Sequence, residues 1–147
     1  MELSNFKIAK GNIALEQGEE YFDLHNCFDF VGLKYDVSKR LVNLYWVKGN
    51  GDWVPKNSPL EIEMSISGVY VFKAQERDKD IPFTEDDCLS SIGFLWNELI
   101  EEMGGYHSNE PKEGCTHLSL EFMSGFALKI GGESASIDAR FSAKPVD

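Results

Sequence analysis

"LEIEMSISGVYVF", residues 60–72, is the stretch that decides the fold. Apolar and polar side chains alternate through residues 60–67. Because successive side chains of an extended chain point to opposite faces, this alternation predicts a half-buried antiparallel strand with one wet face. At Gly68 the pattern breaks, and it resumes over residues 69–72. A glycine at such a change of phase predicts a bulge or a bend.

Upstream, the stretch "FDFVGLKYDVSKRLVNLYWVK", residues 28–48, predicts a second pair of strands. Both arms are rich in aromatic and β-branched residues, and the short polar stretch between them suits a hairpin turn. We expect either Tyr45 or Trp46 in the core, since these neighbours point to opposite faces of one strand. Nearer the N-terminus, the sequence predicts one more short hairpin around Gly11-Asn12.

Downstream, the alternation returns in residues 118–122 and 126–130, which are separated by a Met-Ser-Gly turn. Gly131-Gly132 turns the chain again, and a last alternating run covers residues 135–141. We therefore expect a three-strand antiparallel meander in the C-terminal third of the chain.

The sequence predicts helical structure only for residues 84–103. Thr84 followed by Asp87 resembles a capping box, and Gly104-Gly105 is a natural helix stop. Apolar residues recur there at three- and four-residue steps, namely Leu89, Ile92, Leu95, Trp96, Leu99, Ile100 and Met103. Gly93 weakens the middle, so two short helices or one broken helix both stay open. The expected fold is mainly β, or α+β: an antiparallel sandwich or curved sheet on which this helical segment packs.

The chain length and composition fit one domain, residues 1–147, because 42% of the residues are hydrophobic and can form a core. The formal net charge is -11, and residues 76–113 carry -8 of it, with eleven Asp and Glu against three Lys and Arg. Such a charge repels nucleic acid and anionic membranes and attracts a basic protein partner. The alternative is that the acidity only keeps the protein soluble. The oligomeric state stays open.

Cysteine usage and the N-terminal sequence point to the cytoplasm. Cys27, Cys88 and Cys115 are few and odd in number, so they make no disulfide framework. The first residues lack the basic and apolar regions of a secretory signal, and no apolar run is long enough to cross a bilayer. We therefore expect a cytoplasmic protein.

The sequence offers one arrangement of metal-ligating residues. His25 with Cys27, and Cys115 with His117, are pairs two residues apart, which point to one side of an extended chain. On neighbouring strands the two pairs would present the ligands of a structural zinc site. The alternative is that the cysteines pack as small apolar groups and the histidines face water. Cys88 follows three acids that disfavour its thiolate, and no catalytic or phosphate-binding motif is found, so no cofactor is expected.

Six residues are candidates for contact with a partner. Three adjacent acids fan around the start of the expected helix, which disfavours convergence on one ion but suits an acidic surface. Tryptophan and tyrosine side chains serve as interface anchors because they combine apolar area with a hydrogen-bonding tip. The candidates are Glu85, Asp86, Asp87, Trp53, Trp96 and Tyr106.

Three quoted stretches carry a resemblance to a known group. "FDFVGLKYDVSKRLVNLYWVK", "IPFTEDDCLSSIGF" and "LSLEFMSGFALKIGGESASI" together resemble a group of small, acidic, uncharacterised bacterial proteins over most of residues 6–138. The last stretch is also similar to the terminal hairpin of immunity-type proteins of bacterial toxin systems. This resemblance implies a protein that binds and neutralises a basic toxin domain. Its motifs are structural, so no site residue carries over from it.

Three functions are therefore compatible with the sequence. The first is a non-catalytic, acidic, immunity-type binding protein that recognises a basic protein. The second is a metal-binding protein or enzyme that uses His25, Cys27, Cys115 and His117. The third is a carrier of a small ligand in a β-sandwich cavity, which alternation patterns neither predict nor exclude.

Overall fold

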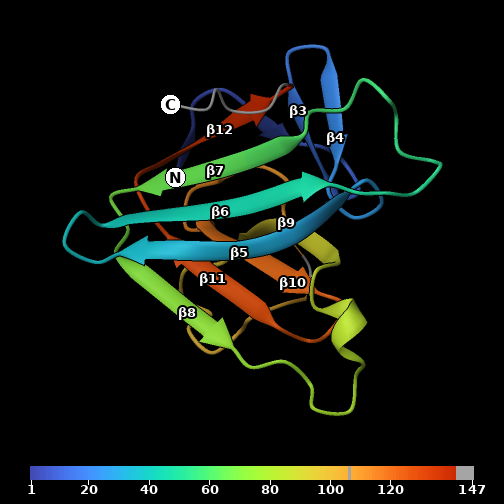
Figure 1. The fold of residues 1–147 in the computed structure, drawn as a ribbon. Coiled ribbons are helices and arrows are strands. Elements are labelled where there is room, and N and C mark those ends of the chain that lie inside the picture. Colours follow the sequence, from blue (N-terminus) through green and yellow to red (C-terminus); the bar gives the residue numbers. More distant parts are fainter. Residues whose placement is uncertain (106, 142–147) are drawn as a thin grey trace.

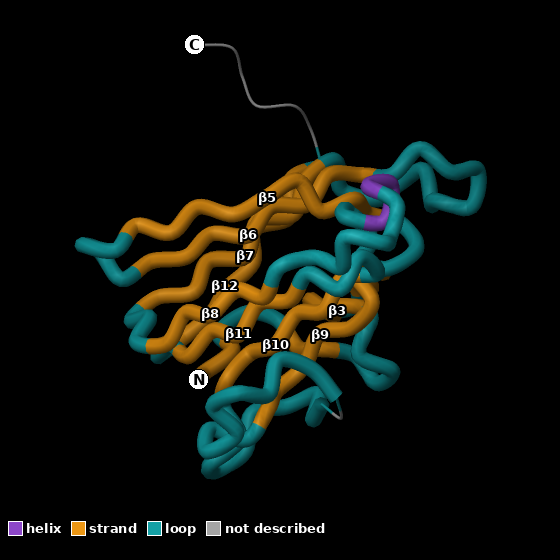
Figure 2. The backbone as a smooth tube through the Cα atoms, turned by 90° about the horizontal axis from the view of Figure 1, so that it is seen from below, coloured by secondary structure: helices purple, strands orange, loops and turns teal. Residues whose placement is uncertain are grey.

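The computed structural model describes residues 1–105 and 107–141. Two sheets pack face to face as a sandwich, and a small third sheet lies at their side (Figures 1 and 2). In chain order the strands are β1 Glu2–Leu3, β2 Lys7–Ile8, β3 Ala14–Gln17, β4 Glu20–Asp23, β5 Phe28–Asp36, β6 Leu41–Lys48, β7 Glu61–Ser67, β8 Val71–Gln75, β9 Leu89–Leu95, β10 His117–Phe122, β11 Ala127–Gly131 and β12 Ser134–Arg140.

The sheets are mainly antiparallel, as predicted. The five-stranded sheet has the order β1-β12-β7-β6-β5, the four-stranded sheet β8-β11-β10-β9, and the small sheet β2-β3-β4. The short β1 runs parallel to β12, and the other strand pairs are antiparallel. No helix in the described residues is long and apolar enough to span a membrane.

The stretch around Gly68 crosses from one sheet to the other. β7 buries Ile62, Met64 and Ile66 completely, which confirms the predicted alternation. Gly68 follows with φ +64, a backbone conformation that glycine adopts without the strain of a Cβ. The chain then enters the four-stranded sheet as β8. The change of phase in the sequence therefore marks the corner of the sandwich.

The predicted hairpins are confirmed. β5 pairs with β6, β10 with β11 and β2 with β3. In the last of these connections Gly11 and Asn12 both have positive φ, and Asn12 N donates to Ala9 O at 3.2 Å. Trp46, one of the two expected core candidates, is 1% exposed and packs edge-on against Phe30.

The predicted C-terminal meander is wrong. β12 pairs with β7 and β1 in the five-stranded sheet, not with β11. Gly131-Gly132 carries the chain between the sheets, and a Cβ on Gly132 would lie 2.8 Å from Ile66 Cγ2. The glycine pair therefore permits a close crossing, whereas the sequence pattern was interpreted as a hairpin turn.

Within residues 1–105 and 107–141, helical structure is confined to one 3-10 turn, η1, at Phe83–Glu85, and residues 84–103 form no longer helix. Residues 89–95 are strand β9 instead. Ile92 and Phe94 face the sandwich core, and on the opposite face of β9 a Cβ at Gly93 would clash with His107. A strand that is buried on both faces loses the alternation of apolar and polar residues. Its apolar residues can then match the spacing of a helix, so periodicity alone does not distinguish the two.

Candidate binding site at the acidic end

The acidic segment, residues 76–113, does not form one surface. Residues 77–87 lie beside β5 and the turn after β10, where Phe30 N donates to Asp87 O at 2.9 Å. Residues 97–104 cross the outer face of the four-stranded sheet (Figure 2). Residues 108–113 run along β9 and β2. The negative charge that is contiguous in sequence is thus divided among three places, contrary to a single acidic face.

The middle part is a strap, residues 97–104, held by lysines of the sheet beneath it. Lys129 Nζ donates to Leu99 O, and Lys73 Nζ donates to Ile100 O at 2.8 Å. Lys129 is 1% exposed, and burial, together with the charge of Lys73, lowers the pKa of its ammonium group. The four-stranded sheet therefore places two lysine ammonium groups beneath this acidic strap.

Trp96 immediately precedes this strap and is half exposed. It follows the last residue of β9, whereas Asp87 lies two residues before the first, so the length of the strand, about 20 Å, separates them. The structure therefore does not bring Trp96 together with the acidic triad. Tyr106, the third expected anchor, lies outside the described residues.

The three acids of the predicted triad have different surroundings. Asp86 Oδ1 lies 2.8 Å from Arg77 Nε, and this hydrogen bond lowers the pKa of the Asp86 carboxyl. The same guanidinium stacks over the Phe83 ring. No ion pair forms at Glu85 or Asp87 within the described chain. Asp86 is thus neutralised internally, and two carboxylates remain available to a partner.

Two more carboxylates join Glu85 and Asp87 around Cys88. Burial raises the pKa of the Cys88 thiol, and the charges of Glu85, Asp87, Asp29 and Asp23 raise it further. The pKa of Asp29 is itself raised, by burial and by the charge of Asp87. We call these four carboxylates the acidic end.

The acidic end has no Lys or Arg ion pair in the part of the chain that the structure describes. Lys48 pairs by register with Phe28, next to Asp29, but its ammonium group donates to Lys56 O at 3.0 Å. Asp23 accepts hydrogen bonds from the backbone N–H groups of His25 and Asn26, at 3.0 and 2.8 Å. These bonds orient Asp23 without cancelling its charge.

Trp53 belongs to the same end of the molecule. Its Nε1 donates to Asn26 O at 2.7 Å, and the adjacent His25 contacts Cys88. The indole is 71% exposed. In Figure 1 the loop between β6 and β7, which carries Trp53, and the η1 turn both project from the right-hand side. A broad aromatic surface therefore accompanies the acidic end.

Cys88 and His25 make contact but lack the arrangement of a nucleophile and its base. The thiol lies 3.6 Å from His25 Nδ1, and Nδ1 donates its proton to Leu89 O at 2.6 Å. That nitrogen is not free to accept the thiol proton, and the raised pKa keeps Cys88 protonated. The contact has a structural role, fixing residues 23–29 against the start of β9.

The four residues of the hypothetical zinc site are not brought together. His25 and Cys27 precede β5, near Cys88, whereas His117 pairs with Leu95 at the far end of β9. Within the described residues, no group of three or more His, Cys, Asp or Glu is placed to hold a metal ion. His117 instead packs against Tyr70, and burial lowers the pKa of its imidazole.

A groove of about 330 Å³ adjoins the acidic end. Its apolar lining comes from Phe30, Val31 and Phe126, and its charged lining from Arg77, Asp86 and Asp87. A β-bulge between Phe30 and Gly32 places Val31 outward, where it is 59% exposed. Bulges of this kind redirect side chains and are frequent beside binding sites.

Sequence reasoning missed Asp23, Asp29 and the groove. The acidic end is assembled by a contact between residues 63 positions apart, His25 and Cys88, for which the sequence contains no local signal. Asp29 stands between Phe28 and Phe30, and this alternation predicts a solvent-exposed carboxylate on the strand. The sequence contains no other sign of these missed features.

No protein-family profile matches the chain, and searches of curated proteins and of solved structures find no significant match.

Proposed function

We propose that this protein is a non-catalytic binding protein that recognises a basic protein partner through the acidic end, as an immunity-type protein does. The observation that carries the proposal is the convergence of Asp23, Asp29, Glu85 and Asp87 without a Lys or Arg ion pair in the described chain. Like charges held close together repel each other, and a cationic partner relieves that repulsion.

Two further features support binding over catalysis. Trp53 supplies an exposed aromatic side chain at the same end, of the kind that anchors interfaces. Cys88 has a raised pKa, and the nitrogen that it contacts, His25 Nδ1, is already engaged with Leu89 O. All four carboxylates act on the Cys88 thiol, and Asp87 also acts on Asp29, so their charges add at this end of the molecule.

The experiment compares two double variants with the same change in charge. Glu85→Gln/Asp87→Asn neutralises the acidic end, and Glu19→Gln/Glu20→Gln neutralises two exposed carboxylates at the β3–β4 turn. A short alternating arginine–glycine peptide serves as the probe, and its binding is measured at low and moderate ionic strength. Electrostatic steering changes association rates by roughly 10-fold or more.

We expect the acidic-end variant to lose most of the affinity and most of the salt dependence, while the control retains both. Equal binding by the two variants, or no binding by the wild type, contradicts the proposal.

A further inference from the structure

We infer that the groove beside the acidic end receives one arginine side chain of the basic partner. This inference rests on the proposed function and names the chemical group that the site recognises. The groove combines apolar walls with carboxylates, and an arginine side chain has the matching parts, an apolar stem and a cationic head.

The apolar walls suit a flat, weakly hydrated cation. Phe30 and Phe122 pack at a centroid distance of 4.7 Å, and Phe122 packs on Phe126 at 5.5 Å. These contacts hold Phe30 and Phe126 in place before a guest arrives. A guanidinium group stacks on aromatic faces more readily than an ammonium group does, because it is planar and less strongly hydrated.

The charges of the groove favour a cationic guest even though Arg77 lines it. Arg77 Nε donates to Asp86, and its two terminal nitrogens donate to the carbonyl oxygens of Asp78 and Ile81. Three of its five N–H donors are therefore engaged within the protein. Asp87 adds a second negative charge to the lining, and Asp29 lies close enough for its pKa to be raised by Asp87. The lining carries one more negative than positive charge, so an anionic guest is disfavoured.

The backbone beside the groove directs recognition to a side chain rather than to an added strand. Phe30 N, on the outer edge of β5, already donates to Asp87 O. The bulge at Val31 then interrupts the regular edge, which hinders the pairing of a guest strand. A guest is thus recognised by the side chain that it inserts.

The experiment uses capped tripeptides and amide chemical shifts of the full-length protein. The probe is Gly-Arg-Gly, and Gly-norleucine-Gly, which keeps an apolar stem without the cation, is its control. We expect Gly-Arg-Gly to shift the amides of Phe30, Val31, Gly32 and Phe126, with at least about tenfold weaker binding of the norleucine peptide.

Variants locate the contacts. Asp87→Asn should weaken binding of Gly-Arg-Gly by about tenfold, and Asp80→Asn, the same change on the same loop but outside the groove lining, by less than about twofold. Val31→Thr keeps the shape of an exposed side chain and tests the apolar wall without endangering the fold, and it should weaken binding by about threefold.

Each other outcome overturns the inference. Shifts centred on Trp53, equal binding of the norleucine peptide, or equal effects of the two Asp variants would show that the groove is not the arginine site. The proposed function can still hold in that case, because the longer arginine–glycine peptide tests the acidic end as a whole. Conversely, specific groove binding of Gly-Arg-Gly, with binding of the longer arginine–glycine peptide that shows no salt dependence, would leave an arginine pocket without the proposed recognition surface.

Discussion

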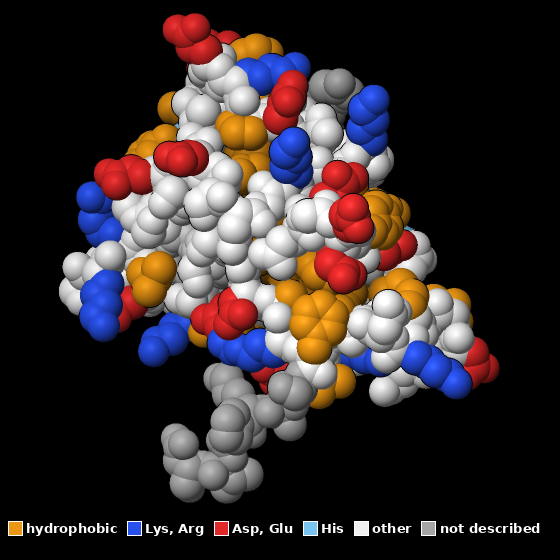
Figure 3. Space-filling view, turned by 90° about the horizontal axis from the view of Figure 1, so that it is seen from above, with side chains coloured by type: hydrophobic (Ala, Val, Ile, Leu, Met, Phe, Trp, Pro, Cys, Tyr) orange, Lys and Arg blue, Asp and Glu red, His pale blue; other side chains and the backbone are white. Residues whose placement is uncertain are grey.

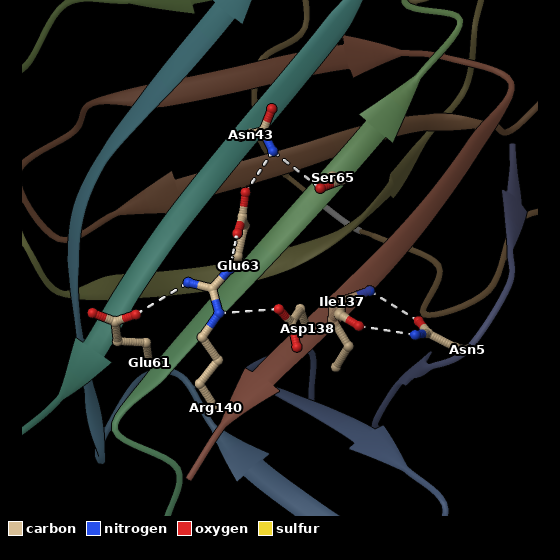
Figure 4. A network of polar contacts seen from close by, with 8 residues as sticks. All are labelled: Asn5, Asn43, Glu61, Glu63, Ser65, Ile137, Asp138 and Arg140. Atoms are coloured by element: carbon tan, nitrogen blue, oxygen red, sulfur yellow. Dashed lines mark hydrogen bonds and ion pairs between the residues drawn. The ribbon is translucent and has the colours of Figure 1, made fainter. Parts of the chain in front are cut away.

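On the outer face of the five-stranded sheet, three carboxylates contact one arginine, whereas at the acidic end four carboxylates have no such partner in the described chain. Arg140 lies 3.2 Å from Glu61, 2.7 Å from Glu63 and 3.0 Å from Asp138 (Figure 4). Asn43 also donates to Glu63 at 2.7 Å. Charges of both signs also mix on the face shown in Figure 3.

Strand register explains the neutralised network. β7 and β12 place Glu61 opposite Arg140 and Glu63 opposite Asp138, so the guanidinium reaches all three carboxylates. The acidic end has no comparable ladder, since its carboxylates come from the ends of β4 and η1, from the start of β5 and from the turn before β9. The comparison teaches that net charge does not define a recognition surface. What distinguishes the acidic end is the absence of internal pairing in the described residues.

The largest expected effect comes from breaking the neutralised network. Arg140→Met leaves three carboxylates side by side without a cation, and we expect the free energy of unfolding to fall by about 1–2 kcal/mol. The expected loss is moderate because a quarter of the Arg140 side chain is exposed to solvent, which screens its charge. Urea denaturation measures the loss. Arg140→Lys, which retains the charge but not the branched guanidinium group, should lower the free energy of unfolding less. Equal stability of Arg140→Met and wild type would contradict this interpretation.

Neutralising two carboxylates should change the free energy of unfolding differently in the two regions. Glu61→Gln/Glu63→Gln removes attraction to Arg140 and should lower the free energy of unfolding by about 1 kcal/mol. Glu85→Gln/Asp87→Asn removes repulsion and should leave it unchanged or raise it by up to about 0.5 kcal/mol. Both differences should shrink as salt is added. A loss of stability in the acidic-end variant would show that those carboxylates make favourable contacts, against the comparison.

A smaller effect distinguishes Asp86 from Asp29 by pH. The pKa of Asp86 is lowered, so its stabilising effect is present above its unfolded pKa of about 3.9 and is lost as pH falls through the folded value. The pKa of Asp29 is raised, so its contribution turns unfavourable as pH rises from about 3.9 through the folded value.

Urea denaturation at about pH 3 and about pH 7 therefore separates the two residues. At neutral pH, Asp86→Asn should destabilise the protein and Asp29→Asn should stabilise it slightly. Both differences should become small in acid. The same sign for both variants at neutral pH would be inconsistent with one paired and one unpaired carboxylate.

The fold could largely be predicted from the sequence because its strands are defined by local alternation. β7 and the hairpins around it needed no information from distant residues. The errors arose where tertiary contacts decide. β9 is covered on both faces and was mistaken for a helix, and Gly131-Gly132 crosses between the sheets instead of closing a meander.

The candidate site could be predicted only in part. Glu85 and Asp87 lie two residues apart in the sequence. Trp53 was predicted as an interface anchor from its residue type, and its side chain is exposed. Asp23 and Asp29 join them because His25 contacts Cys88 across 63 positions, and the pairing of Asp86 with Arg77 depends on the path of the loop. Recognition of a basic partner remains a prediction that binding measurements must test.

The thiol of Cys88 offers the most direct measurement, because it lies among the four carboxylates and reports their combined field. Site-resolved alkylation between about pH 7 and about pH 10 gives its pKa. We expect this pKa to lie above the ordinary value of 9.0 and to fall in Glu85→Gln/Asp87→Asn, while Glu61→Gln/Glu63→Gln leaves it unchanged. The same Cys88 pKa in wild type and in the acidic-end variant would contradict an unneutralised cluster at this end of the molecule.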